Sequence, residues 1–354
     1  MKKINQNIQG MRGICALMVF SGHVTGAYNI PWLQAHAHHP LHLLIDGSAA
    51  VIFFFVLSGY FYYTPKLLTV KSYTHLIIKR ITHLLPPSPY WISIIVGALL
   101  CNYYLNNGIS QEHNVTSWFK SFWNEPVSLQ RFLVEAKVVL RGGASKEFIN
   151  PASWYLNADF KMMIIIPILV WMMNKTRWWL ALPLIILSLI STIQCWIAIF
   201  LMGATFHHYK DQVFKWIGRR HWLLGLLMVI GVVLLDAPTW IEIDVNIDTL
   251  HNRIEMIQAG GVILMLMGFL SFSNLPMLTS QPLLFMGRIS YEFYIIHFIV
   301  LLGLLPYIPN TWLYITVCLA VSLASAVLLH QCGTWFTAHI LNTRMVQYFK
   351  EQNK

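Results

Sequence analysis

Charged residues are scarce in this sequence. Of its 354 residues, only 11% are Asp, Glu, Lys or Arg, whereas 56% are hydrophobic. A typical soluble domain is about one quarter charged. The chain therefore lacks the charge that a water-facing surface needs, which excludes an ordinary soluble enzyme, a disordered protein and a disulfide scaffold. Acidic residues are especially few: there are 14 Asp and Glu against 15 His.

Metal-binding and disulfide patterns are also missing. The five cysteines are scattered, with no C-x-x-C spacing, so we interpret them as small buried hydrophobic residues. There is no H-E-x-x-H segment, so a zinc protease is unsupported. Four histidines that precede the second apolar segment could bind zinc or copper, but a solvated loop is the simpler interpretation: His36, His38, His39 and His42. We expect no metal and no bound cofactor.

Long apolar segments are abundant instead. A helix that crosses a membrane needs about 20 mostly apolar residues. We therefore predict an all-α, polytopic integral membrane protein with about ten transmembrane helices. The expected spans are Ile8–Tyr28, Asp46–Thr64, Pro86–Leu105, Ser153–Met173, Trp178–Ser191, Ile193–Phe206, Trp222–Asp236, Met256–Phe272, Leu284–Leu305 and Trp312–Gln331.

The net charge of +10 predicts orientation and not a nucleic-acid partner. Lys and Arg collect in alternate loops, so both termini are expected in the cytoplasm. The fifth and sixth spans could form one long helix, but the basic segment 207–221 would then lie outside, against the positive-inside rule.

The stretch 106–152 is an expected outer loop that does not follow this charge pattern, and it is long. Its segment Val127–Leu140 has apolar residues at helical spacing and suggests an interfacial helix on the outer face. We expect one transmembrane domain over residues 1–354, with 106–152 as an extracytoplasmic or interfacial loop and no appended soluble domain.

Polar residues inside apolar spans are costly and usually face a cavity or carry function. Arg12 and His23 lie eleven residues apart, which places them on one face of a helix with about 16 Å of rise between them. An Arg can bind a phosphate or carboxylate, and a His can act as a general base. The alternative is an Arg that reaches the headgroups and a His bonded to a neighbouring helix.

Further polar elements follow along the chain. Ser58-Gly59 is interpreted equally well as a functional element or as a helix-packing site. The Lys79-Arg80 cluster is likewise either functional or simply the positive charge that sets the orientation of the protein in the membrane. The other candidates are Tyr60, Trp154, Asp159, Glu292 and His297.

Taken together, these segments resemble acyltransferase family 3, membrane proteins that transfer acyl groups onto cell-envelope carbohydrates. The Arg12-to-His23 spacing is similar to the family's first-helix signature. The other elements that resemble family motifs, in family order, are Phe54 to Tyr60, Arg80 to Pro86, Trp154 to Asp159, Phe200 to Gly203, and Ile289 to His297.

Some positions depart from the family pattern. His83 stands where a second Arg is common, which weakens a two-Arg clamp. Tyr155 replaces the usual Ser, and Asp159 replaces the usual Glu, so its reach is one methylene shorter.

The resemblance implies cytoplasmic acyl-CoA, commonly acetyl-CoA, as co-substrate and a sugar hydroxyl as acceptor. Arg12, Arg80 and Lys79 would bind the donor. His23 would either deprotonate the hydroxyl or carry the acyl group itself.

Of the carboxylates, Asp159 would orient His23, with Glu292 as the second choice. Ser58, Tyr60 and Trp154 would line the acyl or sugar site, and His297 is either structural or part of that site.

The implied function is a membrane O-acyltransferase, and most simply an O-acetyltransferase, of the bacterial inner membrane. It would act on an envelope carbohydrate in free or lipid-linked form, such as lipopolysaccharide O-antigen or exopolysaccharide. The alternative is a transporter or flippase for a lipid-linked sugar or acyl carrier, because intramembrane Arg, His and Glu would serve either function. A structural partner in polysaccharide export is disfavoured, since it would not need the Arg12–His23 face.

Overall fold

The computed structural model describes eleven stretches of the chain: residues 5–28, 39–63, 73–74, 77, 88–109, 115–136, 148–175, 177–190, 196–218, 220–241 and 248–336. Within these stretches the chain is helical, and its β-structure is a single antiparallel bridge between Tyr28 and Val115. The chain divides into two compact units. The all-α prediction is confirmed for the described residues.

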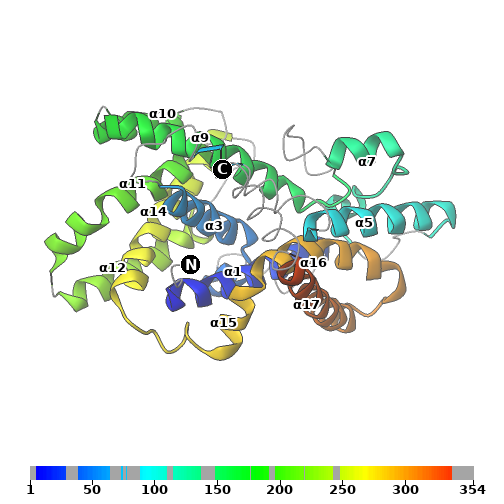
Figure 1. Cartoon of the computed structure of the whole chain (residues 1–354). Helices are drawn as coiled ribbons and strands as arrows, with labels where there is room; N and C mark the ends of the chain where they lie inside the picture. The colour runs from blue at the N-terminus through cyan, green and yellow to red at the C-terminus, as the bar shows by residue number, and fades with distance from the viewer. Residues whose placement is uncertain are drawn as a thin grey trace. The chain divides into compact units, whose positions relative to one another are not determined.

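The first unit comprises residues 1–25, 29–72 and 155–288. Its helices are α1 (Gln6–Ala27, up to Thr25), η1 (Pro40–Ile45), α3 (Gly47–Tyr62), α9 (Ser153–Lys175, from Tyr155), η3 (Trp178–Leu180), α10 (Ala181–Ile190), α11 (Trp196–Ile217), α12 (His221–Leu235), α13 (Ala237–Trp240), α14 (Asp248–Ser271) and α15 (Gln281–Arg288). Figure 1 shows α12 beside α14, where Gly231 and Gly261 let the two backbones approach closely.

The second unit comprises residues 26–28, 73–154 and 289–354. Its helices are α5 (Pro89–Asn106), α6 (Ser117–Lys120), α7 (Leu129–Ala136), α16 (Ser290–Leu304), η4 (Leu305–Tyr307) and α17 (Thr311–Phe336). α16 packs against both α5 and α17 and is buried along most of its length.

Four described helices are long and apolar enough to cross a membrane: Ser153–Lys175, Arg253–Ser271, Ser290–Tyr307 and Thr311–Trp335. Two shorter helices, α3 and α12, are also apolar. A polytopic membrane protein follows from these helices, whereas the number of ten spans and the side of each terminus remain predictions.

Two expected boundaries differ from the structure. The basic segment 207–221 was expected to be a loop, but α11 continues through it to Ile217 and ends at Gly218. Gly218 has a positive φ of 63° and its N–H donates to Phe214 O, which is the usual way for glycine to end a helix. The expected helix 284–305 is interrupted at Ile289, between α15 and α16.

Helices α3 and α11 run in the same direction. Phe55 near the middle of α3 packs on Trp196 and Phe200 at the start of α11, at ring distances of 5.9 and 4.8 Å. Tyr63, just after α3, packs on His207 further along α11, at 4.6 Å. This parallel arrangement is the one expected if the fifth and sixth spans are separate helices. If they formed one long helix, α11 would be expected to run opposite to α3.

Candidate active site

α1 carries Arg12 and His23 on one uninterrupted helix, as their spacing predicts. Both side chains are half-buried. The backbone on either side of Arg12 lies against other segments of the same unit, because a Cβ on Gly10 would lie 1.8 Å from Leu278 O and one on Gly13 would lie 2.5 Å from Leu283 O. These close approaches fix the position of the Arg12 turn against the backbone at Leu278 and Leu283.

The His23 turn lies at the start of α3. A Cβ on Gly22, the preceding residue, would lie 2.8 Å from Ile45 O and 2.9 Å from Gly47 N. α3 begins there with Asp46 as its N-cap, whose Oδ1 accepts a hydrogen bond from the Ala49 amide at 3.0 Å. The cap and the glycine contact together hold the His23 turn against the first residues of α3.

Asp159 lies at the opposite end of α3. Its Oδ2 accepts a hydrogen bond from the Tyr62 hydroxyl at 2.7 Å, and its Oδ1 is buried without a hydrogen-bond partner among the described residues. The 16 residues of α3 separate this point from the His23 turn by about 22 Å along the helix axis. The expected contact in which Asp159 orients His23 is therefore not formed, and Asp159 has Tyr62 as its partner.

The C-terminal end of α3 also meets a cluster of polar and aromatic side chains on α11. Tyr60 stacks on His207 at 4.3 Å, and Lys210 Nζ lies 2.9 Å from His207 Nε2 and 3.4 Å from the Tyr60 hydroxyl. His207 Nδ1 lies 2.7 Å from Tyr60 O, which favours the tautomer whose Nδ1–H donates to that carbonyl. The hydrogen-bond partners of the Lys210 ammonium are thus neutral groups.

Gly59 joins α3 to α11 through a close backbone contact. A Cβ on Gly59 would lie 1.9 Å from Phe200 O, and one on Gly203 would lie 2.1 Å from Val56 O. The packing interpretation of Ser58-Gly59 therefore holds for Gly59. Ser58 itself is half-buried on the same helix.

In the second unit, a buried carboxylate organises the segment that leads into α9. Glu135 on α7 accepts hydrogen bonds from the amides of Ile149 (2.8 Å) and Asn150 (3.2 Å). The Asn150 side-chain amide donates to Ser93 on α5 and to Ile295 O on α16. The Ser153 hydroxyl also donates to Glu135 Oε1 at 3.5 Å, so this network reaches the residue before Trp154, which is half-buried. Burial raises the pKa of Glu135 to about 7.

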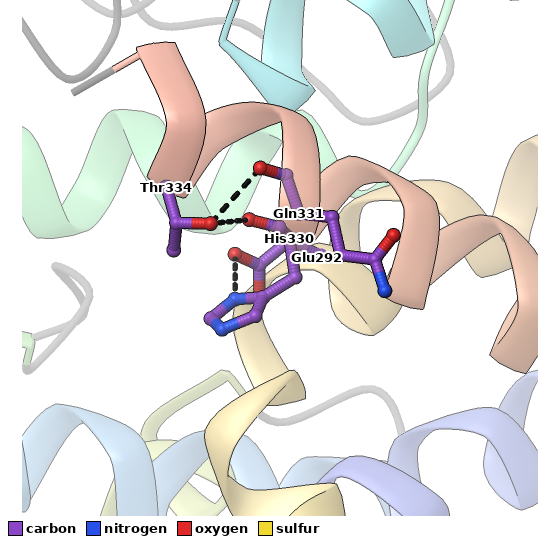
Figure 2. A network of polar contacts seen from close by, with 4 residues as sticks. All are labelled: Glu292, His330, Gln331 and Thr334. Carbon is purple, nitrogen blue, oxygen red and sulfur yellow. Dashed lines mark hydrogen bonds and ion pairs between the residues drawn. The ribbon is translucent and has the colours of Figure 1, made fainter. Parts of the chain in front are cut away.

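Glu292 and His297 both lie on α16 and are used differently. Glu292 Oε1 lies 2.9 Å from His330 Nδ1 of α17, as Figure 2 shows. His297 is fully buried, and its Nδ1 lies 2.7 Å from Tyr294 O and 3.2 Å from Phe293 O on its own helix. The hydrogen bonds of His297 favour the structural interpretation.

Several predicted residues lie outside the described parts of the chain: Lys79, Arg80, His36 and His38. Of the outer histidine cluster, His39 and His42 are described, and His39 caps η1 by accepting from the Leu41 amide. Within the described stretches, the His, Cys, Asp and Glu side chains form no group of three or more that could hold a metal ion.

Comparison with known proteins identifies the family of this chain. A family model for an acyltransferase domain, that of acyltransferase family 3, matches residues 5–331. The chain belongs to this family. No curated protein and no solved structure gives a significant match. The molecule is accordingly a membrane acyltransferase.

The family assignment gives two of the quoted segments a shared structural role. The element Phe54 to Tyr60 of α3 and the element Phe200 to Gly203 of α11 contain the two glycines that bring these helices together. In this acyltransferase the two elements therefore form one interface, which holds Ser58 and Tyr60 in place.

Four residues that were not predicted as site residues make contacts described above: Tyr62, Glu135, Lys210 and His330. Tyr62 and His330 pair with carboxylates that had been singled out, so an ionisable or hydroxyl side chain in an apolar segment was the available signal. Lys210 had been assigned to a loop, and Glu135 to an interfacial helix in a region where burial was not expected.

Proposed function

We propose that this acyltransferase moves an acyl group, and specifically an acetyl group, from cytoplasmic acyl-CoA to a hydroxyl of an envelope carbohydrate. O-antigen or exopolysaccharide units, in free or lipid-linked form, are the proposed acceptors, and the bacterial inner membrane is the proposed location. The observation that carries the proposal is the position of Arg12 and His23 on one face of α1, about 16 Å apart along its axis. A cation and a base at two depths of one helix suit a donor and an acceptor that arrive from opposite sides.

Arg12 binds the anionic donor in this proposal. A guanidinium forms short, charge-assisted hydrogen bonds with phosphate oxygens. Lys79 and Arg80 add positive charge on the same predicted side of the membrane. Lys210 supplies a further cation, since its hydrogen-bond partners Tyr60 and His207 are neutral.

His23 acts at the acceptor. Its imidazole takes the proton of the sugar hydroxyl while the oxygen attacks the thioester carbonyl, which yields the ester and the free thiol. The second route has His23 attack first and carry the acyl group as an acyl-imidazole. Trapping of an acyl-enzyme in the absence of acceptor separates the two routes.

Asp159 has a different role from the one expected at His23. Its Oδ1 is buried and unpartnered among the described residues, so it can accept a hydrogen bond from a substrate N–H or O–H at the Tyr62 end of α3. Ser58, Tyr60 and Trp154 are the proposed lining of the acyl or sugar site.

The test is acetyl transfer in membrane vesicles from labelled acetyl-CoA to envelope carbohydrate. We expect His23→Ala to lose at least about 10²-fold in activity, as for removal of a general base, and Arg12→Ala to lose activity through weaker binding of the donor. His221→Ala and Arg177→Ala are matched controls, because both residues are exposed in the same unit. Full transfer by correctly inserted His23→Ala would refute the mechanism, and lipid-linked sugar movement without transfer would favour a flippase.

A further inference from the structure

The turn between α11 and α12, in the first unit, carries positive charge. Lys215 lies in the last turn of α11, and Arg220 is the N-cap residue of α12. Both side chains are exposed, and among the described residues neither has an ion-pair partner. Residues 211–222 of the sequence contain three cations and one acid, Asp211, so this segment has a net charge of +2. The turn therefore attracts an anionic group.

Two exposed tryptophans flank the same turn, which Figure 1 shows as the short connection from α11 to α12. Trp216 follows Lys215 and is 71% exposed, and Trp222 is the second residue of α12. Tryptophan is enriched at the level of the lipid headgroups, because its ring is apolar and its N–H is polar. Cations and tryptophans together are the composition of a membrane–water interface.

An apolar stripe continues from Trp222 along α12. Its members recur every three or four residues and so share one face of the helix: Trp222, Leu226, Val229 and Val233. All four are between 48% and 69% exposed. The opposite face packs on α14, where Gly231 lies against the backbone of Gly261. The stripe is therefore the side of α12 that the protein leaves uncovered.

The length of the stripe matches one leaflet of a bilayer. Eleven residues separate Trp222 from Val233, which is about 16 Å along the helix axis. Half of a hydrocarbon core of about 30 Å is about 15 Å. Since the chain is a membrane acyltransferase and α12 is one of its apolar helices, a lipid acyl chain is what lies against this face.

We infer that this face binds a phospholipid with an anionic headgroup, with the phosphate at the turn that carries Lys215 and Arg220 and an acyl chain along the α12 stripe. A soluble phosphate would neutralise the turn but leave the stripe uncovered. A zwitterionic lipid would cover the stripe but bring a positive group to the turn. The inference goes beyond acyl transfer and does not depend on the donor or the acceptor.

Photo-crosslinking tests this site directly. Phosphatidylglycerol or phosphatidylcholine with a diazirine in one acyl chain is added to the purified full chain in detergent, and the adducts are mapped by peptide mass spectrometry. A basic residue near an anionic lipid surface contributes about 1 kcal/mol, which is about fivefold in concentration. We expect adducts on α12, and half-saturating phosphatidylglycerol about fivefold higher in Lys215→Gln and in Arg220→Gln. Phosphatidylcholine labelling should not change.

Arg253→Gln is the matched control, because it removes an exposed cation of the same unit. Gly268 of α14 lies against Met228 and Gly261 against Gly231, so α14 runs opposite to α12 and Arg253 lies towards the other end of α12. This variant should label as the unmodified protein does.

Two more variants test the two halves of the site. Asp211→Asn removes the acid beside the turn and should lower the half-saturating concentration of phosphatidylglycerol. Leu226→Gln changes an exposed side chain of the stripe, so it should weaken the labelling by both lipids to the same extent.

Several outcomes would overturn the inference. They are the absence of adducts on α12, equal half-saturation by the two lipids in the unmodified protein, and unchanged labelling in both cation variants. An equal effect of Arg253→Gln would show attraction to the net charge of the protein and no site at the turn. Displacement of labelled phosphatidylglycerol by an equal concentration of glycerol 3-phosphate would show that the phosphate alone is the ligand, and would overturn the choice of a lipid. Unchanged labelling in Leu226→Gln would overturn the placement of the acyl chain.

Discussion

Replacing Gly59 by Ala tests the contact that joins α3 to α11. A Cβ at this position would lie 1.9 Å from Phe200 O, whereas ordinary contact begins at 3.4 Å. The obstacle is backbone of a helix that is buried at this point, so it cannot turn aside as a flexible side chain would. The two helices must separate by about 1.5 Å or tilt, because the clash with backbone cannot otherwise be relieved.

The expected cost follows from this displacement. Overpacking of a well-packed interface costs about 1–3 kcal/mol, from which the better helix propensity of Ala recovers about 1 kcal/mol. We therefore expect the melting temperature of the detergent-solubilised protein to fall by a few degrees, at about 2–4 °C per kcal/mol. Acetyl transfer should fall further, by up to about 10²-fold, since a displacement of about 1 Å can misplace Tyr60 and Ser58.

Gly225→Ala is the matched control for this prediction. Gly225 also lies within a helix, α12, but a Cβ there would meet nothing within 4 Å. This variant gains helix propensity without a clash, so its melting temperature should stay the same or rise. Equal melting temperatures and activities for the two variants would refute the reasoning. Gly203→Ala, whose Cβ would lie 2.1 Å from Val56 O, should reproduce the effect from the other helix.

Two further predictions follow from buried carboxylates. Tyr62→Phe removes the hydrogen bond to Asp159, so we expect loss of transfer activity with normal membrane insertion, and an Asp159→Asn, Tyr62→Phe double variant no worse than the more damaging single variant. Activity that falls additively would contradict this pairing. Burial raises the pKa of Glu135 from 4.5 to about 7, so its contribution to stability is complete below pH 4.5 and is lost as the pH rises through 7, with an amplitude on the order of 3 kcal/mol. Thermal unfolding of Glu135→Gln between pH 5 and pH 8 should lack that decline, and an unchanged pH dependence would exclude Glu135 as its source.

Local features of this protein could be predicted from the sequence, whereas long-range pairings could not. Arg12 and His23 share a face of α1 because eleven residues make three turns of any straight α-helix. Gly59 was recognisable as a packing residue, but its partner on α11 lies more than 140 positions away and no periodicity links the two. The extension of α11 to Ile217 was missed because basic residues were interpreted as a loop, although no Gly or Pro lies between His207 and Ile217.

The scarcity of acidic residues limits how a carboxylate can support a histidine in this membrane protein. Asp159 was the natural partner for His23, yet the structure commits it to Tyr62 at the far end of α3. Asp46 lies close to the His23 turn, but it caps α3 and accepts a hydrogen bond from the Ala49 amide. Glu292 forms a histidine–carboxylate pair within the second unit, because its Oε1 lies 2.9 Å from His330 Nδ1. Each of these three carboxylates is thus used where it lies, in a hydrogen bond with Tyr62, in a helix cap or in a pair with His330.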